Sequence, residues 1–173
     1  MDFFETIEKR HSCREYKPDA VPEDSLARIL EAARIAPSGS NQQPWRFIVV
    51  KDPETRRKLV SASKGQRFIA DAPVVIVACG ETFKTNRGDW MGWYGMLLDV
   101  AIAVEHMHLA ATALGLASCW IGAFNAKQVR EILDIPEEIK VVALLPIGLS
   151  AGKPEPRDRK PLTEIVSYEK YAF

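Results

Sequence analysis

The longest apolar stretch of the chain, residues 96–116, is the feature that most constrains the fold. It is long enough to cross a membrane. Four ionisable side chains interrupt it, however, and such groups are unfavourable inside a bilayer. These side chains are Asp99, Glu105, His106 and His108. We therefore predict a buried helix over residues 93–115, in a protein with no membrane partner.

The rest of the sequence supplies a core for such a helix. The chain has 173 residues, of which 47% are apolar and 27% charged, as in a soluble globular protein. We expect one domain over residues 1–173. Strands are predicted at residues 47–50, 74–78, 118–121 and 141–145, and shorter helices at residues 3–10, 22–36, from 53 and from 125. This alternation is typical of a layered α/β or α+β fold.

The end of the chain has a different character. Residues 150–161 are rich in proline and charge and cannot form a core, yet the last six residues include Tyr168, Tyr171 and Phe173. We predict an extended C-terminal arm over residues 150–173. Its apolar end would dock on the protein's own body or on a partner subunit.

Charge and cysteine content exclude several functions. Lys and Arg number 23 and Asp and Glu also number 23, with a pI near 6.8. Nucleic-acid binding needs a basic surplus, so we do not expect a nucleic-acid partner. Cys13, Cys79 and Cys119 are far apart and odd in number, which argues against a disulfide framework or zinc site. With no visible signal peptide, the expected location is cytoplasmic.

Motifs of several enzyme classes are missing. The sequence contains no GxG, so neither the dinucleotide fingerprint nor the P-loop is present, and it contains no HExxH. His106 and His108 lie on different faces of a helix, so no metal site is predicted. Residues 148–152 match GxSxG, but Pro154 follows where that motif needs a helix. We therefore do not expect a serine hydrolase.

Four polar segments carry the candidate chemistry. Residues 10–14 place two guanidinium groups around a hydroxyl, and residues 156–161 hold three cations between prolines, which suits a phosphate. Residues 36–45 form a loop with three amides, groups that suit a heterocycle. Residues 120–125 contain a glycine after a short strand, where a backbone N–H can approach a ligand. Each segment alone also has an ordinary structural explanation.

Together these segments resemble the nitroreductase family of FMN-dependent oxidoreductases. The resemblance runs over almost the whole chain and rests on the order and spacing of its motifs. They lie at residues 7–14, 36–45, 71–73, 115–117, 120–122, 146–148 and 157–161. The chain is similar to a short member, because little room remains after Ala78 for inserted lid helices.

The resemblance implies an α+β fold, a nitroreductase-like three-layer sandwich whose mixed, mainly antiparallel sheet is flanked by helices. It implies an obligate homodimer with exchanged C-terminal arms and two FMN sites at the interface. The implied activity moves two electrons from NADH or NADPH to a small organic acceptor of nitroaromatic or quinone type, by ping-pong hydride transfer.

The resemblance also implies roles for individual residues. Arg10, Ser12, Arg157 and Arg159 would contact the FMN phosphate, and the Gly122 N–H would face flavin N5. Arg14 and Gln66 would face the pyrimidine edge of the flavin, Gln66 at a carbonyl, with Ser38 and Asn41 reaching it across the interface. The predicted cofactor site comprises Arg10, His11, Ser12, Arg14, Pro37, Ser38, Asn41, Gln66, Ile121, Gly122, Gly148, Arg157 and Arg159. For His11, the alternative is that it only separates Arg10 from Ser12 and makes no contact with the cofactor. The substrate pocket would include Trp90, Trp93 and Phe124. No catalytic side chain is implied, because the flavin carries the chemistry.

Three alternatives stay open at this point. The same fold could serve a dehalogenase, a flavin-fragmenting enzyme or a heterocycle dehydrogenase. It could also form a non-enzymatic flavin-binding dimer, or bind a phosphate ligand without flavin. The sequence leaves open the acceptor, the choice between NADH and NADPH, and whether residues 81–95 line the substrate pocket.

Overall fold

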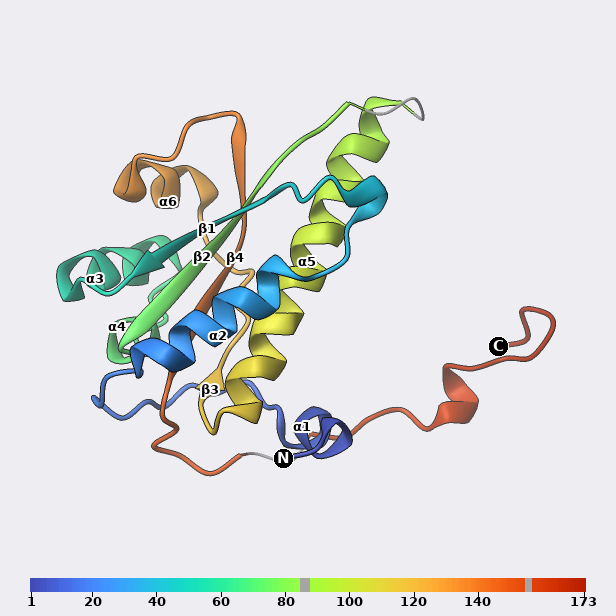
Figure 1. The fold of residues 1–173 in the computed structure, drawn as a ribbon, viewed down its shortest axis with the longest axis horizontal. Helices are drawn as coiled ribbons and strands as arrows, with labels where there is room; N and C mark the ends of the chain where they lie inside the picture. Colours follow the sequence, from blue (N-terminus) through green and yellow to red (C-terminus); the bar gives the residue numbers. More distant parts are fainter. Residues whose placement is uncertain (85–87, 155–156) are drawn as a thin grey trace.

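A computed structural model describes residues 1–84, 88–154 and 157–173, with the side chain of Asp89 left out (Figure 1). Its α-helices are α1 (Phe3–Lys9), α2 (Glu23–Arg34), α3 (Pro53–Ala62), α4 (Phe68–Asp71), α5 (Asp89–Ala113) and α6 (Ala126–Leu133). Its strands are β1 (Trp45–Val50), β2 (Val74–Glu81), β3 (Ala117–Ser118) and β4 (Ile139–Gly148). Two short 3₁₀ helices are η1 (Gly39–Asn41) and η2 (Leu162–Glu164).

The four strands form one sheet in the order β1-β2-β4-β3, and each neighbouring pair is antiparallel. Val77 in the central strand lies opposite Ile48 on one side and Leu144 on the other. A parallel bridge joins Ser12 to Ser118 beyond the end of the sheet. The predicted mainly antiparallel sheet is therefore confirmed, and its one parallel pairing among the described residues is this isolated bridge. Strands β2 and β4 are longer than predicted, whereas the strand predicted at residues 118–121 is only the two-residue β3 at 117–118.

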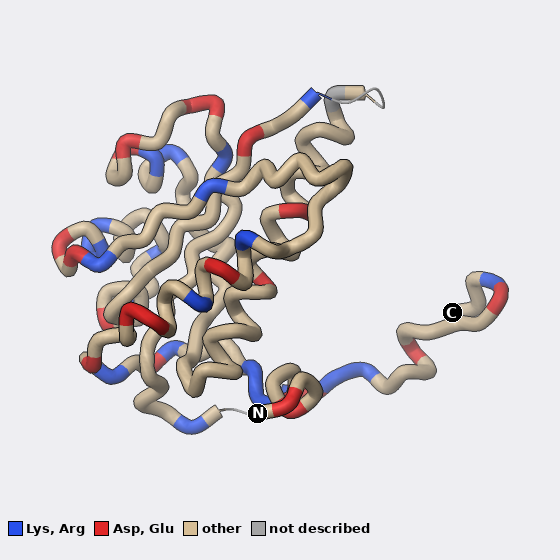
Figure 2. The backbone as a smooth tube through the Cα atoms, in the orientation of Figure 1, with Lys and Arg blue, Asp and Glu red and all other residues tan. Residues whose placement is uncertain are grey.

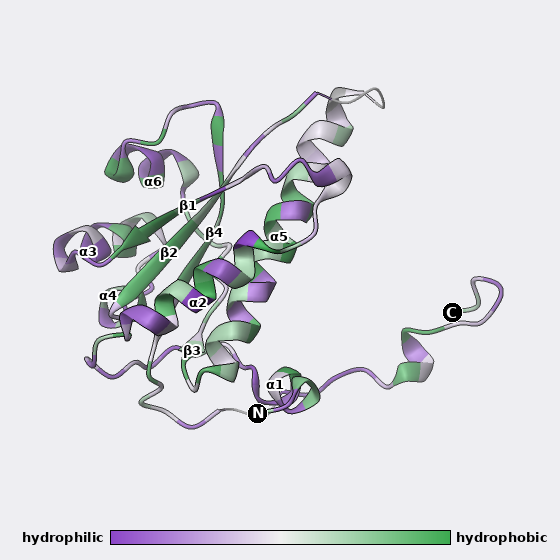
Figure 3. Cartoon of the chain, viewed as in Figure 1, coloured by the Kyte–Doolittle hydropathy of each residue, from purple (hydrophilic) through white to green (hydrophobic). Residues whose placement is uncertain are grey.

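The sheet is the middle of three layers. In β2, Ile76 packs with α2 and α5 on one face, while Val75 and Val77 pack with α3, α4 and α6 on the other. Because side chains alternate along a strand, this continuous apolar run serves both cores. Figure 3 shows the resulting apolar sheet, with polar residues on α2, α3 and α6.

The long apolar helix α5 is a core helix. It begins at Asp89, four residues before its predicted start, and it packs against α2 and all four strands. By length and composition alone its residues 90–113 could cross a membrane, a test that core helices of soluble proteins also pass. Its packing within the molecule favours the predicted buried role.

Three of the polar side chains on α5 fasten other segments to it. The Asp99 carboxylate accepts a hydrogen bond from the Gly39 N–H at 3.0 Å. His106 Nδ1 lies 3.1 Å from the carbonyl oxygen of Ala32 in α2, and His108 Nε2 lies 3.3 Å from that of Ser118 in β3. Buried polar groups are tolerated when they are bonded. These side chains therefore hold loop, helix and strand in place.

The first turns of α5 are packed unusually closely against the chain that follows β2. A Cβ atom on Gly92 would lie 1.8 Å from the Phe83 carbonyl oxygen, and one on Gly95 would lie 3.1 Å from the Phe83 ring. Only glycine leaves enough room at position 92. The tip of the molecule that carries Trp90 and Trp93 is thus fixed to the end of β2.

The C-terminal arm leaves the body next to α1 and extends into solvent (Figure 1). Its apolar side chains are exposed, including Leu162, Tyr168, Tyr171 and Phe173. Large exposed apolar side chains in one segment mark a surface that packs against another molecule. The extended arm has the predicted character, and its exchange between subunits stays a prediction.

We expect Gly92→Ala to destabilise the protein by about 1–3 kcal/mol, because the added methyl group would overlap the Phe83 backbone. In an unobstructed helix the same change stabilises by about 1 kcal/mol, so the sign of the change in unfolding free energy distinguishes the two cases. Urea denaturation measures it, with Gly122→Ala as a control whose Cβ would approach no described atom closer than 3.9 Å. An unchanged or raised stability of Gly92→Ala would contradict this packing.

Candidate functional site

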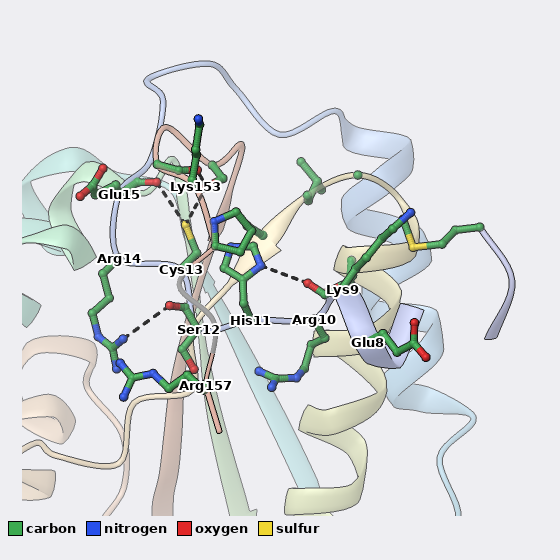
Figure 4. Close-up of a pocket in the computed structure, with 18 of the residues that line it drawn as sticks. Glu8, Lys9, Arg10, His11, Ser12, Cys13, Arg14, Glu15, Lys153 and Arg157 are labelled. Atoms are coloured by element: carbon green, nitrogen blue, oxygen red, sulfur yellow. Dashed lines mark hydrogen bonds between the residues drawn. The ribbon is translucent and has the colours of Figure 1, made fainter. Parts of the chain in front are cut away.

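A cavity of about 670 Å³ lies beside α1, at the C-terminal end of α5 (Figure 4). Its lining comes mainly from residues 8–15 and the turn at 115–117. The first part of the C-terminal arm adds residues between 150 and 159. Six residues of the predicted cofactor site are brought together here. They are Arg10, His11, Ser12, Arg14, Arg157 and Arg159. Pro156, in the same predicted segment, lies outside the described residues.

The local sequence explains how the first of these residues reach the cavity. A capping box between Asp2 and Glu5 starts α1, and the helix ends where Arg10 becomes extended. The chain then runs beside β3, with the Cys13 N–H donating to the Ser118 carbonyl at 3.0 Å. In extended chain, alternate side chains share a face, so Ser12 and Arg14 are exposed while Cys13 is buried.

The cavity is rich in positive charge. Its lining includes Lys9, Arg10, Arg14, Lys153, Arg157 and Arg159, against the carboxylates of Glu8 and Glu15. Figure 2 shows basic residues both near α1 and at the start of the arm. Figure 4 shows the side chains of Arg14 and Arg157 extending to the same side. Guanidinium groups bind phosphate oxygens through charge-assisted hydrogen bonds, so the donor set fits a phosphate.

Tyr16 lies behind Cys13 of the cavity lining and has a structural role. The Tyr16 hydroxyl donates to the carbonyl oxygens of Cys13 at 3.0 Å and Pro146 at 3.2 Å, and burial raises the pKa of Tyr16. Burial also raises the pKa of Cys119, and that of Cys79 to about 11. Tyr16, Cys79 and Cys119 therefore stay protonated near neutral pH.

The loop that carries Pro37, Ser38 and Asn41 lies elsewhere. It packs over the middle of α5, where Asp99 accepts from Gly39. Thirteen residues of helix separate Asp99 from Thr112 in the cavity wall, a rise of about 20 Å. One chain therefore does not bring this loop and the cationic cavity into one site.

The predicted substrate residues Trp90 and Trp93 are still farther along α5, at its first turns, where they are 64% and 50% exposed. Their rings face solvent, and Trp90 lies near Tyr94 with ring centroids 6.2 Å apart. Within the segment 81–95, residues 85–87 lie outside the described residues. The single chain thus places these aromatic side chains far from the cavity.

Gln66 lies in a third place, beside the turn at residues 122–124 that precedes α6. Gln66 Nε2 donates to the carbonyl oxygens of Ser63 at 3.0 Å and Ala123 at 3.2 Å. Both of its N–H groups are used, so Gln66 has no free donor for the predicted contact with a flavin carbonyl. It instead holds the turn that exposes Gly122, close to the predicted residue Phe124.

Two predicted cofactor residues have structural surroundings. Ile121 is buried and pairs with Leu144 of β4. A Cβ on Gly148 would lie 2.7 Å from Pro73 Cδ and 3.0 Å from Tyr16 Cδ1. Neither residue lines the cavity. Position 148 needs glycine because the core leaves no room for a Cβ there. Contact of either residue with a cofactor stays a prediction.

Sequence reasoning missed several residues of the cavity, including Lys9, Ser150 and Lys153. The sequence indicates these residues only weakly. Lys9 is a further cation next to Arg10, and Ser150 and Lys153 belong to the polar turn that follows β4. It also gave Asp99 no role in the site. A lone carboxylate in an apolar stretch was read only as evidence against a membrane span.

Comparisons with known proteins place this geometry in a family. A profile of the nitroreductase family matches residues 7–66 and 60–149. A crystal structure of a nitroreductase family protein from Clostridium difficile is 37% identical, with a TM-score of 0.86 over 99% of this chain and 100% of that one. The chain therefore belongs to the nitroreductase family, and the predicted oxidoreductase class is confirmed.

Two named relatives show the range of the family. An NADH dehydrogenase of Thermus thermophilus is 33% identical over 187 residues, covering 91% of this chain and 91% of its own. A 5,6-dimethylbenzimidazole synthase of Rhodospirillum rubrum is 30% identical over 183 residues, covering 90% of this chain and 82% of its own.

The contact between Glu105 and His108 on α5 predicts how the stability of the fold changes with pH. Glu105 Oε2 lies 3.6 Å from His108 Nδ1, and interaction with that ring lowers the pKa of Glu105 below its ordinary 4.5, with Arg10 adding to the shift. A lowered folded pKa stabilises the fold above the unfolded value, and this stabilisation is lost as pH falls through the folded value.

Glu105→Gln should therefore unfold at lower urea concentration than wild type at neutral pH, and the difference should disappear in acid. Urea titrations across this pH range measure it. Glu131→Gln is the matched control, since Glu131 is an exposed carboxylate of the same kind, 3.8 Å from Lys127. If the stability difference between wild type and Glu105→Gln grew in acid, the lowered pKa of Glu105 would be contradicted.

Proposed function

We propose that two copies of this chain form a dimer that binds FMN at two composite sites. At each site, electrons would pass from NADH or NADPH to a small organic acceptor of nitroaromatic or quinone type. Family membership and the cationic cavity support this proposal. Three free, buried cysteines are consistent with a reducing cytoplasm.

The separation of the candidate residues along α5 supports the dimer. The cavity lies at the end of α5, and the Ser38–Asn41 loop lies about 20 Å away, so one chain cannot join them. Two α5 helices that pack antiparallel about a two-fold axis would place the loop of one subunit near the cavity of the other. In such an isologous contact, both sites form at once.

The exposed surface of α5 supports the same packing. Trp90, Tyr94, Leu98 and Ile102 are exposed and follow each other at four-residue spacing, which places them along one side of the helix. An apolar stripe of this size on a soluble protein marks an interaction surface. The exposed apolar arm would then wrap the partner, which removes its side chains from water.

The residues of the cavity fit the phosphate of FMN, and Gly122, outside the cavity, suits its ring. Arg10, Arg157 and Arg159 would hold the phosphate, with the Ser12 hydroxyl as a further donor. Arg14 would face the pyrimidine edge, and the exposed Gly122 N–H would hydrogen-bond at N5. FMN, when bound, supplies two-electron transfer at its ring. The protein's part is to bind the phosphate, orient the ring and keep one ring face open.

Aromatic side chains suggest the acceptor class. In the proposed dimer, Trp90 and Trp93 would come from the subunit that supplies the loop, and Phe124 from the subunit that supplies Gly122. Flat aromatic walls favour planar aromatic molecules through stacking. Donor and acceptor would use the same open face in turn, which gives ping-pong kinetics.

A second candidate is a synthetic or degradative flavin chemistry in the same site. It is favoured by the similarity to the benzimidazole synthase, whose name describes a reaction other than nitro reduction. On this alternative the protein binds FMN, but NADH and NADPH do not reduce it for transfer to a nitroaromatic or quinone.

The visible spectrum of the purified protein, followed by anaerobic titration with NADH and NADPH, tests the proposal. We expect a yellow protein whose flavin bands bleach with one or both donors and return on addition of a nitroaromatic or quinone. Double-reciprocal plots should be parallel. Bound FMN that no donor bleaches would favour the second candidate, and a protein that takes up no FMN would contradict both.

A further inference from the structure

Asp99 is a buried carboxylate whose position the core does not explain. It lies on α5 with only 5% of its surface exposed, and its helix neighbours Met96, Val100 and Ala103 belong to the buried apolar core. Burial of a charged group is unfavourable unless hydrogen bonds compensate for it. An apolar residue would fill this place in the helix at lower free energy.

The contacts of Asp99 all point to one loop. Oδ1 accepts from the Gly39 N–H at 3.0 Å, and a Cβ on Gly39 would lie 3.9 Å from both carboxylate oxygens. Oδ2 is buried without a hydrogen-bond partner among the residues that the structure describes. The carboxylate thus faces the loop at 37–43 and keeps capacity for a further donor.

That loop has an unfavourable backbone. Ser40, Asn41 and Gln43 have φ values of 49°, 55° and 49°, in the left-handed region that non-glycine residues rarely adopt. Inside the loop, the Gln43 N–H donates to Ser38 Oγ at 3.0 Å, and Gln43 Nε2 donates to Asn41 Oδ1 at 3.0 Å. Such a conformation persists only where surrounding contacts hold it.

We propose that Asp99 is a positioning residue that fixes this loop on α5, so that Ser38 and Asn41 keep the arrangement in which they meet the FMN of the opposite subunit. The inference rests on the proposed function. It assigns the buried carboxylate to the geometry of the flavin site, although Asp99 itself touches no cofactor. His106 and His108 differ from it, because they fasten a helix and a strand of the core.

Two substitutions at position 99 test this role in the full-length dimer. Asp99→Ala removes the acceptor and should weaken FMN binding about tenfold, the effect of losing one hydrogen bond of ordinary strength. It should also change the visible spectrum of the bound flavin. Asp99→Asn keeps a carbonyl oxygen for the Gly39 N–H, and its FMN affinity should stay within about threefold of wild type.

Gly39→Pro reaches the same bond from the loop and leaves the core intact. It removes the N–H that Asp99 accepts, and the extended backbone of Ser38 (φ −143°, ψ 155°) is compatible with a following proline. We expect it to weaken FMN binding as Asp99→Ala does. This variant keeps the inference testable if Asp99→Ala does not fold.

Ser63→Ala is the control for general loss of a buried polar group. Ser63 is fully buried at the end of α3, and its hydroxyl has no hydrogen-bond partner among the residues that the structure describes. It should leave FMN affinity and spectrum unchanged. Wild-type FMN binding and spectrum in folded Asp99→Ala and Gly39→Pro would overturn the inference, as would Asp99→Asn as impaired as Asp99→Ala. A different result would contradict the proposed function itself: wild-type protein would take up no FMN.

Discussion

The burial of α5 is the constraint on which the rest of the structure depends. An apolar helix of 25 residues can be stable in water only when helices and strands cover it. α2 and the sheet do so over much of its length, and its polar side chains are bonded to backbone groups of the segments around it. Asp99, His106 and His108 thereby determine where a loop, a helix and a strand lie.

The same helix separates the candidate chemistry. The cationic cavity lies near its end, the amide-rich loop near its middle and the exposed tryptophans at its start. Each group is incomplete as a cofactor site in one chain. The exposed apolar side of α5 and the apolar arm are the surfaces that a second copy would cover, so assembly and cofactor binding are expected to be one event rather than two.

Much of the fold could be predicted from sequence, because it follows from patterns of neighbouring residues. The β-branched run at 74–78 predicts the central strand, and the apolar stretch at 96–116 predicts the core helix. The order of the motifs indicates the family. Other features depend on tertiary packing. The sequence does not reveal that Pro73 and Tyr16 crowd Gly148. It also does not reveal that two backbone carbonyl groups accept both N–H groups of Gln66 in the single chain.

The composite site is tested most directly in a mixed dimer, purified through a different tag on each subunit. One subunit carries Arg10→Ala and Arg159→Ala in the cavity, and the other carries Ser38→Ala and Asn41→Ala in the loop. Each parent homodimer has two damaged sites, whereas the mixed dimer has one site with both lesions and one with neither. We expect the mixed dimer to regain one tight FMN site. FMN binding no tighter than in the two parents would contradict a site shared between subunits.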